Sequence, residues 1–148
     1  MITKDEILMG RDKKYPEEYT QEISNNIDKL LKAMNEVRKA YGKSMIVASG
    51  WRPAEINEDT SNAAKNSNHI KGLAIDIKDT DGKLWKWVIM NLGLMKSLGI
   101  YLEDKRWTPT WVHFQVVPPK SKKRIYIPST SPAKAEDIWN GIYDSKYN

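Results

Sequence analysis

Residues 73–77, with the sequence LAIDI, carry the alternating pattern that decides the fold class. Their three large aliphatic side chains fall on one side of an extended strand, and Asp76 falls on the other. Residues 111–117, WVHFQVV, repeat this alternation, with His113 on the polar side. We therefore predict two strands, each with an apolar face toward a core and a metal-competent side chain on the opposite face.

Other segments predict helices and short strands around this pair. Residues 21–41 carry apolar side chains at helical spacing and end before Gly42, a residue that commonly terminates helices. The remaining predicted elements are strands at 44–49, 101–102 and 124–127 and helices at 83–98 and 131–143. This order predicts an α+β fold in which helices flank a small, mostly antiparallel sheet.

The whole chain, residues 1–148, is interpreted as one domain, because no repeat, linker or low-complexity tract divides it. Residues 1–20 carry scattered apolar positions, among them Met9, and are expected to pack as an N-terminal arm. Residues 44–117 form the part of the domain that carries the motifs described below. Within that part, residues 50–68 form a long polar loop, and long loops in compact domains are often functional.

Composition and charge exclude several classes of protein. The chain is 40% hydrophobic and 29% charged, so it is not disordered by composition. No apolar run approaches the ~20 residues of a membrane-spanning helix, so we expect no membrane span. The net charge of +5 favours anionic partners. We expect no nucleic acid among them, because the charge is modest and no recognition motif is present. Oligomeric state is not indicated.

The chain has no cysteine and only two histidines, which restricts its chemistry. Disulfides, thiol nucleophiles and thiolate zinc sites are excluded. His69 ends the polar loop, so it can converge with Asp76 and His113 if the two predicted strands are neighbours. Two histidines and one carboxylate form a ligand set of catalytic zinc sites. The alternative interpretation is that both histidines are structural hydrogen-bonding residues.

Side chains near the strand ends offer substrate contacts. Arg52 can hold a carboxylate through paired hydrogen bonds, or it can form an ordinary surface ion pair. Trp51 and Trp111 can line a substrate cleft, or they can pack in the core. The residues alone leave these alternatives open.

Three blocks of the chain resemble motifs of the M15 zinc peptidases. Residues 67–77, SNHIKGLAIDI, are similar to the family motif Ser-x-His-x-x-Gly-x-Ala-x-Asp. Residues 49–53, SGWRP, resemble its Ser-Gly-aromatic-Arg element, and residues 111–115, WVHFQ, resemble its closing aromatic-x-His motif. The family comprises D-alanyl-D-alanine carboxypeptidases and dipeptidases and the L-alanyl-D-glutamate endopeptidases of phage endolysins.

The resemblance implies the hedgehog-like metallopeptidase fold and a Zn²⁺ cofactor. The implied zinc ligands are His69, Asp76 and His113. Arg52 is implied to hold a substrate carboxylate or to orient the scissile carbonyl, with the motif residue Ser67 nearby. The implied substrate is the stem peptide of peptidoglycan.

One position departs from the family pattern. Family members usually have Glu or Asp three residues before the last histidine ligand as the general base, and this chain has Thr110 there. General acid–base catalysis typically contributes ~10²–10⁴-fold. We expect Asp104 or Glu103 to replace the missing base and prefer Asp104. Two alternatives stay open: the strand is shifted against the family pattern, or both acids only pair with neighbouring basic residues.

Two functions follow from these residues. The first is a zinc-dependent peptidase that cuts an amide bond in peptidoglycan stem peptides. The second, motivated by Thr110, is a zinc-holding module that binds wall peptides or a protein partner. Because Lys4, Asp5 and Glu6 stand where a secretory signal would be apolar, we expect no such signal. The expected location is then the cytoplasm until release to the wall, as for a phage lysin, or the virion.

Overall fold

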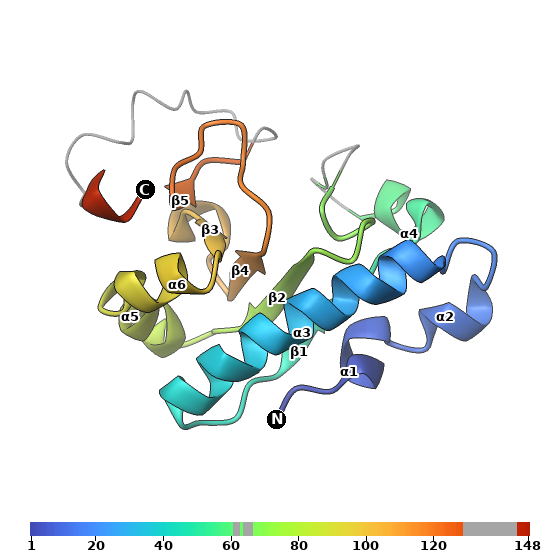
Figure 1. The fold of residues 1–148 in the computed structure, drawn as a ribbon, viewed down its shortest axis with the longest axis horizontal. Helices are drawn as coiled ribbons and strands as arrows, with labels where there is room; N and C mark the ends of the chain where they lie inside the picture. Colours follow the sequence, from blue (N-terminus) through green and yellow to red (C-terminus); the bar gives the residue numbers. More distant parts are fainter. Residues whose placement is uncertain (61–62, 64–66, 129–144) are drawn as a thin grey trace.

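A computed structural model describes residues 1–60, 63, 67–128 and 145–148 (Figure 1). Within these residues five strands form one sheet in the order β1-β2-β4-β3-β5. The strands are β1 (Val47–Ser49), β2 (Ala74–Lys78), β3 (Tyr101–Glu103), β4 (Trp111–Gln115) and β5 (Ile125–Tyr126). Neighbouring strands are antiparallel except β3 and β5, which are parallel. The predicted α+β fold with a mostly antiparallel sheet is confirmed.

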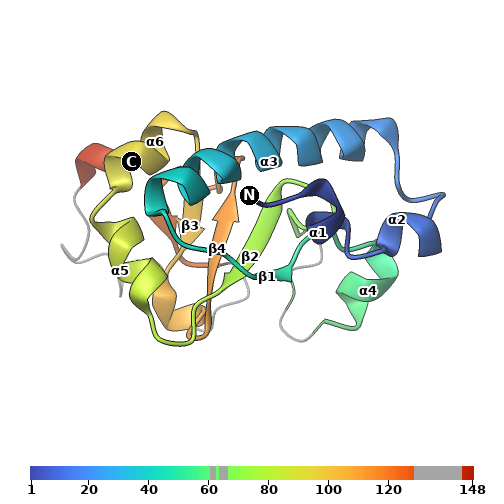
Figure 2. The same ribbon diagram turned by 90° about the horizontal axis from the view of Figure 1, so that it is seen from below.

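The longest helix, α3 (Gln21–Tyr41), lies across one face of the sheet (Figures 1 and 2). At its first turn the Thr20 hydroxyl accepts a hydrogen bond from the backbone nitrogen of Ile23, which satisfies a donor that the helix leaves unpaired. At its end Gly42 adopts a left-handed conformation with φ of 74°. Both predicted boundaries of this helix are confirmed.

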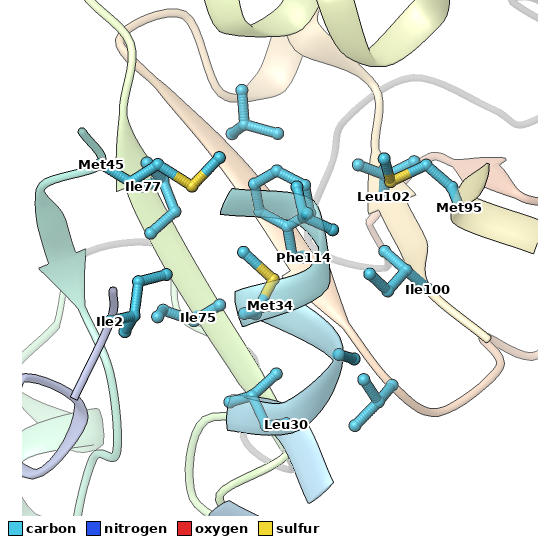
Figure 3. Close-up of a cluster of buried hydrophobic side chains, with 14 of the residues drawn as sticks. Ile2, Leu30, Met34, Met45, Ile75, Ile77, Met95, Ile100, Leu102 and Phe114 are labelled. Carbon is cyan, nitrogen blue, oxygen red and sulfur yellow. The ribbon is translucent and has the colours of Figure 1, made fainter. Parts of the chain in front are cut away.

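The hydrophobic core lies between α3 and the apolar face of the sheet. The buried apolar residues of α3 are Ile27, Leu30, Ala33, Met34 and Val37. Figure 3 shows Leu30 and Met34 beside Ile75, Ile77 and Phe114 of the two central strands. Full burial of such a side chain contributes about 1.5–3 kcal/mol. The core therefore fixes which face of each strand turns inward, and the alternate residues Asp76 and His113 face the other way.

The N-terminal arm packs at one end of the sheet as α1 (Lys4–Leu8) and α2 (Arg11–Lys14), near α4 (Ala54–Glu58) (Figure 2). Ile7 and Leu8 are buried, as expected of a packed arm. Met9 is 42% exposed instead, because it ends α1 in a left-handed conformation that takes it out of the helix. The carbonyl oxygen of Ile7 accepts a hydrogen bond from the backbone nitrogen of Trp51 at 2.9 Å. This bond ties the arm to the loop after β1.

The segment predicted as one helix over 83–98 forms two helices, α5 (Lys83–Ile89) and α6 (Leu92–Ser97). Asn91 separates them with non-helical backbone angles, and its side chain donates to the carbonyl oxygen of Trp87 at 2.7 Å. Asparagine competes with the helix for backbone partners in this way. The helix predicted at 131–143 lies outside the described residues. No helix in the described part of the chain is long and apolar enough to cross a membrane.

Candidate metal centre

His69, Asp76 and His113 converge on the polar face of the sheet. Asp76 on β2 lies opposite His113 on β4, with 2.9 Å between Oδ1 of Asp76 and Nδ1 of His113. His69 approaches the same carboxylate from the turn before β2, with 3.3 Å between its Nε2 and Oδ2 of Asp76. One ligand-competent atom from each residue lies within 4.8 Å of the other two. The neighbouring strands thus bring together the three residues singled out in the sequence.

The end of β1 positions His69. The β1–β2 register shifts between Val47 and Ser49, so that Ser49 lies opposite Asp76. The carbonyl oxygen of the next residue, Gly50, lies 2.8 Å from Nδ1 of His69. A Cβ atom at Gly50 would lie 2.1 Å from the carbonyl oxygen of Ile7. Only glycine lets the arm and this loop approach so closely.

The electrostatics of the cluster favour an ionised carboxylate between two imidazoles. Burial raises the pKa of Asp76. The charge of His69 and the hydrogen bonds from both histidines lower it by more, so the pKa lies well below its ordinary value. Burial lowers the pKa of His113, but the charge of Glu103 and the hydrogen bond to Asp76 raise it to about 9. In the metal-free protein His113 is therefore an imidazolium at neutral pH, and a bound cation would have to replace its proton.

This donor set fits zinc. Each imidazole presents one nitrogen to Asp76, and its other nitrogen meets an oxygen acceptor of the protein. Nδ1 of His69 meets the Gly50 carbonyl oxygen, and Nε2 of His113 meets Oε1 of Gln115 at 2.8 Å. Such outer contacts orient the histidine ligands of metal sites. Two histidines and a carboxylate leave a fourth zinc position for water or substrate. These residues could therefore hold a catalytic zinc ion.

Arg52 and Ser67 lie beside the three candidate ligands. The Arg52 guanidinium donates from one NH2 group to the Ser67 hydroxyl oxygen at 3.3 Å, and the same oxygen accepts from the backbone nitrogen of His69 at 3.2 Å. Arg52 is only 8% exposed, and its Nε has no hydrogen-bond partner among the described residues. The pKa of Arg52 is lowered, because the effect of burial is larger than the opposing effect of the Asp76 charge. A buried guanidinium with an unused donor is suited to an anionic ligand.

A family model described as Peptidase M15 matches residues 4–108, which is more than half of the chain. The chain belongs to the M15 peptidase family. The matched range includes Arg52, His69 and Asp76 but ends before β4. In this M15 peptidase, His113 is thus placed in the site by its register with Asp76. Searches of curated proteins and of solved structures gave no match.

Glu103 is an acid that lies against the candidate metal ligands. It ends β3, which pairs with β4, and its Oε1 lies 3.8 Å from Nε2 of His113. Its side chain is 20% exposed, so solvent or a substrate can reach it. Thr110, at the usual family position of the base, is exposed in the turn before β4, and its carbonyl oxygen accepts from the backbone nitrogen of Asp79.

Asp104, the base preferred from the sequence, is engaged elsewhere. Its carboxylate accepts hydrogen bonds from the backbone nitrogen, Nε and an NH2 group of Arg106, at 2.9–3.0 Å. It thereby caps the short 3₁₀ helix η1 (Lys105–Trp107) and is fully buried. The structure thus shows Asp104 in the ion pair that the sequence left open, and of the two acids only Glu103 contacts a candidate ligand.

The two tryptophans considered for substrate binding occupy different environments. Trp51 is fully buried, with its ring edge-on to that of Tyr19 and its Nε1 donating to the carbonyl oxygen of Ile70 at 2.9 Å. Of its two open roles, the structure shows packing in the core. Trp111 is half-buried at the start of β4, two residues before His113 and therefore on the same face. Of the two tryptophans, Trp111 is the one on the face of the candidate ligands.

Gln115 and Tyr126 also belong to this face, although no sequence motif indicated a role for either. Oε1 of Gln115 accepts hydrogen bonds from Nε2 of His113 and from the Tyr126 hydroxyl. Gln115 could have been found from its spacing, because it lies two residues after His113 on one strand. Tyr126 could not, because it reaches the site through the parallel pairing of β5 with β3, where it lies opposite Glu103.

Proposed function

We propose that this M15 peptidase is a zinc-dependent enzyme that hydrolyses an amide bond in the stem peptides of peptidoglycan. The observation that carries the proposal is the convergence of His69, Asp76 and His113 beside Glu103 and Arg52. Membership of the family supports peptidase chemistry, and the donor set supports zinc. Within this proposal we favour a phage-lysin type of cell-wall hydrolase that is released to the wall, on the resemblance of the motif blocks.

Zinc held by the two histidines and Asp76 would polarise the scissile carbonyl and lower the pKa of a bound water. Glu103 accepts a proton from the attacking water and donates it to the amide nitrogen that leaves. Its contact with His113 places it at the rim of the metal centre, and its partial exposure keeps it within reach of a substrate. This general-base role is worth about 10²–10⁴-fold in rate.

Arg52 binds a carboxylate of the stem peptide. Ser67 holds one arm of its guanidinium, and the buried Nε has no hydrogen-bond partner among the described residues. Trp111 contributes an aromatic surface at the edge of the same face. Binding energy from these groups fixes the scissile bond relative to Glu103, which lowers the entropic part of the barrier.

The alternative function is a zinc-holding module that binds wall peptides without cutting them. The observation that favours it is Thr110, which supplies no base at the position where the family has one. This alternative uses the same ligands and the same arginine. It differs from the peptidase only in that Glu103 has no catalytic role.

The deciding experiment compares zinc-loaded protein with a chelated sample on purified peptidoglycan, with released fragments identified by mass spectrometry. Chelator-sensitive stem-peptide fragments support the peptidase, and their masses identify the bond. Zinc-loaded Glu103→Gln serves as the matched control. Protein that retains its zinc but releases no fragments from several wall types would overturn the peptidase in favour of the binding module.

A further inference from the structure

Gln115 lies at the centre of a hydrogen-bond network beside His113, and the proposed chemistry assigns Gln115 itself no step. Its side chain is 1% exposed and lies on the same face of β4 as His113. Its Nε2 donates to the carbonyl oxygen of Val117 at 2.7 Å. Its Oε1 accepts from Nε2 of His113 and from the Tyr126 hydroxyl. Every polar atom of this buried amide therefore meets a partner.

The network fixes the orientation of the amide. The carbonyl oxygen of Val117 can only accept, so the NH2 group of Gln115 must face it. The oxygen of Gln115 must then face His113. Because this oxygen cannot donate, the nitrogen that it meets has to carry the proton, and that nitrogen is Nε2 of His113.

The proton on Nε2 decides how His113 can bind a metal. A neutral imidazole has one protonated nitrogen and one lone pair, so a proton on Nε2 leaves the lone pair on Nδ1. Nδ1 is the atom that lies 2.9 Å from the Asp76 carboxylate, inside the ligand cluster. We propose that Gln115 and Tyr126 are positioning residues that hold His113 with its proton on Nε2, so that Nδ1 is the zinc ligand. This inference rests on the proposed zinc site.

Tyr126 reinforces the arrangement from the edge of the sheet. Its hydroxyl donates to the same oxygen of Gln115, and its ring stands edge-on to His113 with 6.5 Å between centroids. β5 thus contributes to the metal centre although no ligand lies on it. Loss of the Tyr126 hydroxyl leaves the hydrogen bond between Gln115 and His113 in place. Its effect on zinc binding is therefore smaller than that of losing the Gln115 amide.

The test measures zinc dissociation constants by chelator competition for wild type, Gln115→Leu and Tyr126→Phe, with Gln21→Leu on the exposed start of α3 as matched control. Removal of an outer partner of a ligating histidine typically weakens metal binding 10–100-fold. We expect that loss in Gln115→Leu, a smaller loss in Tyr126→Phe and none in Gln21→Leu. Long-range ¹H–¹⁵N correlation spectra of the zinc-loaded wild type should show His113 protonated at Nε2 and coordinated through Nδ1.

A merely structural role for Gln115 would lower the melting temperature and leave the zinc affinity and the His113 signals unchanged. Unchanged affinity in Gln115→Leu, or coordination of His113 through Nε2 in the wild type, would overturn the inference alone. A wild type that binds no zinc would overturn the proposed function with it. If Gln115→Leu does not fold, the zinc affinity of Tyr126→Phe and the wild-type spectra decide. An unchanged zinc affinity in Tyr126→Phe, or coordination of His113 through Nε2, then overturns the inference.

Discussion

Asp76 and His113 lie directly opposite each other in the antiparallel pair β2–β4, 37 residues apart in sequence and 2.9 Å apart between Oδ1 and Nδ1. Both positions are polar interruptions of apolar strands, and the core packs on the residues before and after them. A slip of one residue in either strand would turn its polar side chain into the core. Burial of the apolar face therefore holds these two candidate metal ligands in register.

The first prediction concerns the ligands. Substitution of His69→Ala or His113→Ala should abolish stoichiometric zinc binding and all activity, because two ligands remain where zinc needs at least three from the protein. Zinc content after gel filtration measures this, with circular dichroism to confirm folding. Stoichiometric zinc retained in both variants would show that the site is wrongly placed.

The second prediction separates the two neighbouring acids. Glu103→Gln should keep zinc and lose about 10²–10⁴-fold in turnover, since it removes the proposed base. Asp104→Asn should keep turnover but lower the melting temperature, because it weakens the ion pair with Arg106 and the cap of η1. Fragment release and thermal unfolding are measured on both zinc-loaded variants. Normal turnover in Glu103→Gln would exclude it as the base.

The sequence could predict that the candidate ligands converge, because their positions follow local rules. Alternation places Asp76 and His113 on the polar side of each strand, and adjacency of the strands brings them together. Which of the two neighbouring acids lies near the candidate ligands could not be predicted in this way. Glu103 and Asp104 are successive residues of extended chain, so they point to opposite sides, and the pairing of β3 with β4 decides which one lies near His113.

Two other differences have physical causes of the same kind. The apolar pattern of residues 83–98 is helical throughout, but Asn91 diverts a backbone carbonyl and divides the segment. For Trp51 the sequence left a cleft position and a core position open, and in the structure the carbonyl oxygen of Ile70 satisfies its polar NH group inside the core. Both outcomes depend on partners that become neighbours only in the folded chain.

The third prediction concerns pH in the metal-free protein. The pKa of His113 is raised from 6.5 to about 9, because the charge of Glu103 and the hydrogen bond to Asp76 outweigh burial. Protonated His113 therefore stabilises the folded metal-free protein. This contribution is fully present below about pH 6.5 and is lost as the pH rises through about 9. Zinc affinity should rise over the same interval, because the metal replaces this proton. Urea unfolding of metal-free protein and zinc titrations at pH 6, 7.5 and 9 measure both trends. Flat zinc affinity across this range would contradict the prediction.

The fourth prediction concerns the close approach of the arm and the site. Gly50→Ala should destabilise the protein by about 1–3 kcal/mol, the usual cost of overpacking, because its Cβ would collide with the carbonyl oxygen of Ile7. It should also weaken zinc binding, since the carbonyl oxygen of Gly50 orients His69. Gly42→Ala is the matched control: nothing lies within 4 Å of its Cβ, so only backbone strain is expected. Equal zinc affinity in the two variants would argue against a positioning role for the loop.

The last prediction concerns the substrate carboxylate. Arg52→Lys keeps the positive charge but loses the planar fork of the guanidinium, so substrate binding should weaken while zinc affinity is unchanged. A hydrogen bond to a charged group contributes about 1.5–3 kcal/mol, which corresponds to about 10- to 150-fold in kcat/KM. The comparison uses steady-state kinetics on a stem peptide and on its C-terminal amide, with Arg38→Lys on α3 as control. If Arg52 holds the carboxylate, wild type prefers the free acid and Arg52→Lys loses that preference. A preference that survives the substitution would place the carboxylate elsewhere.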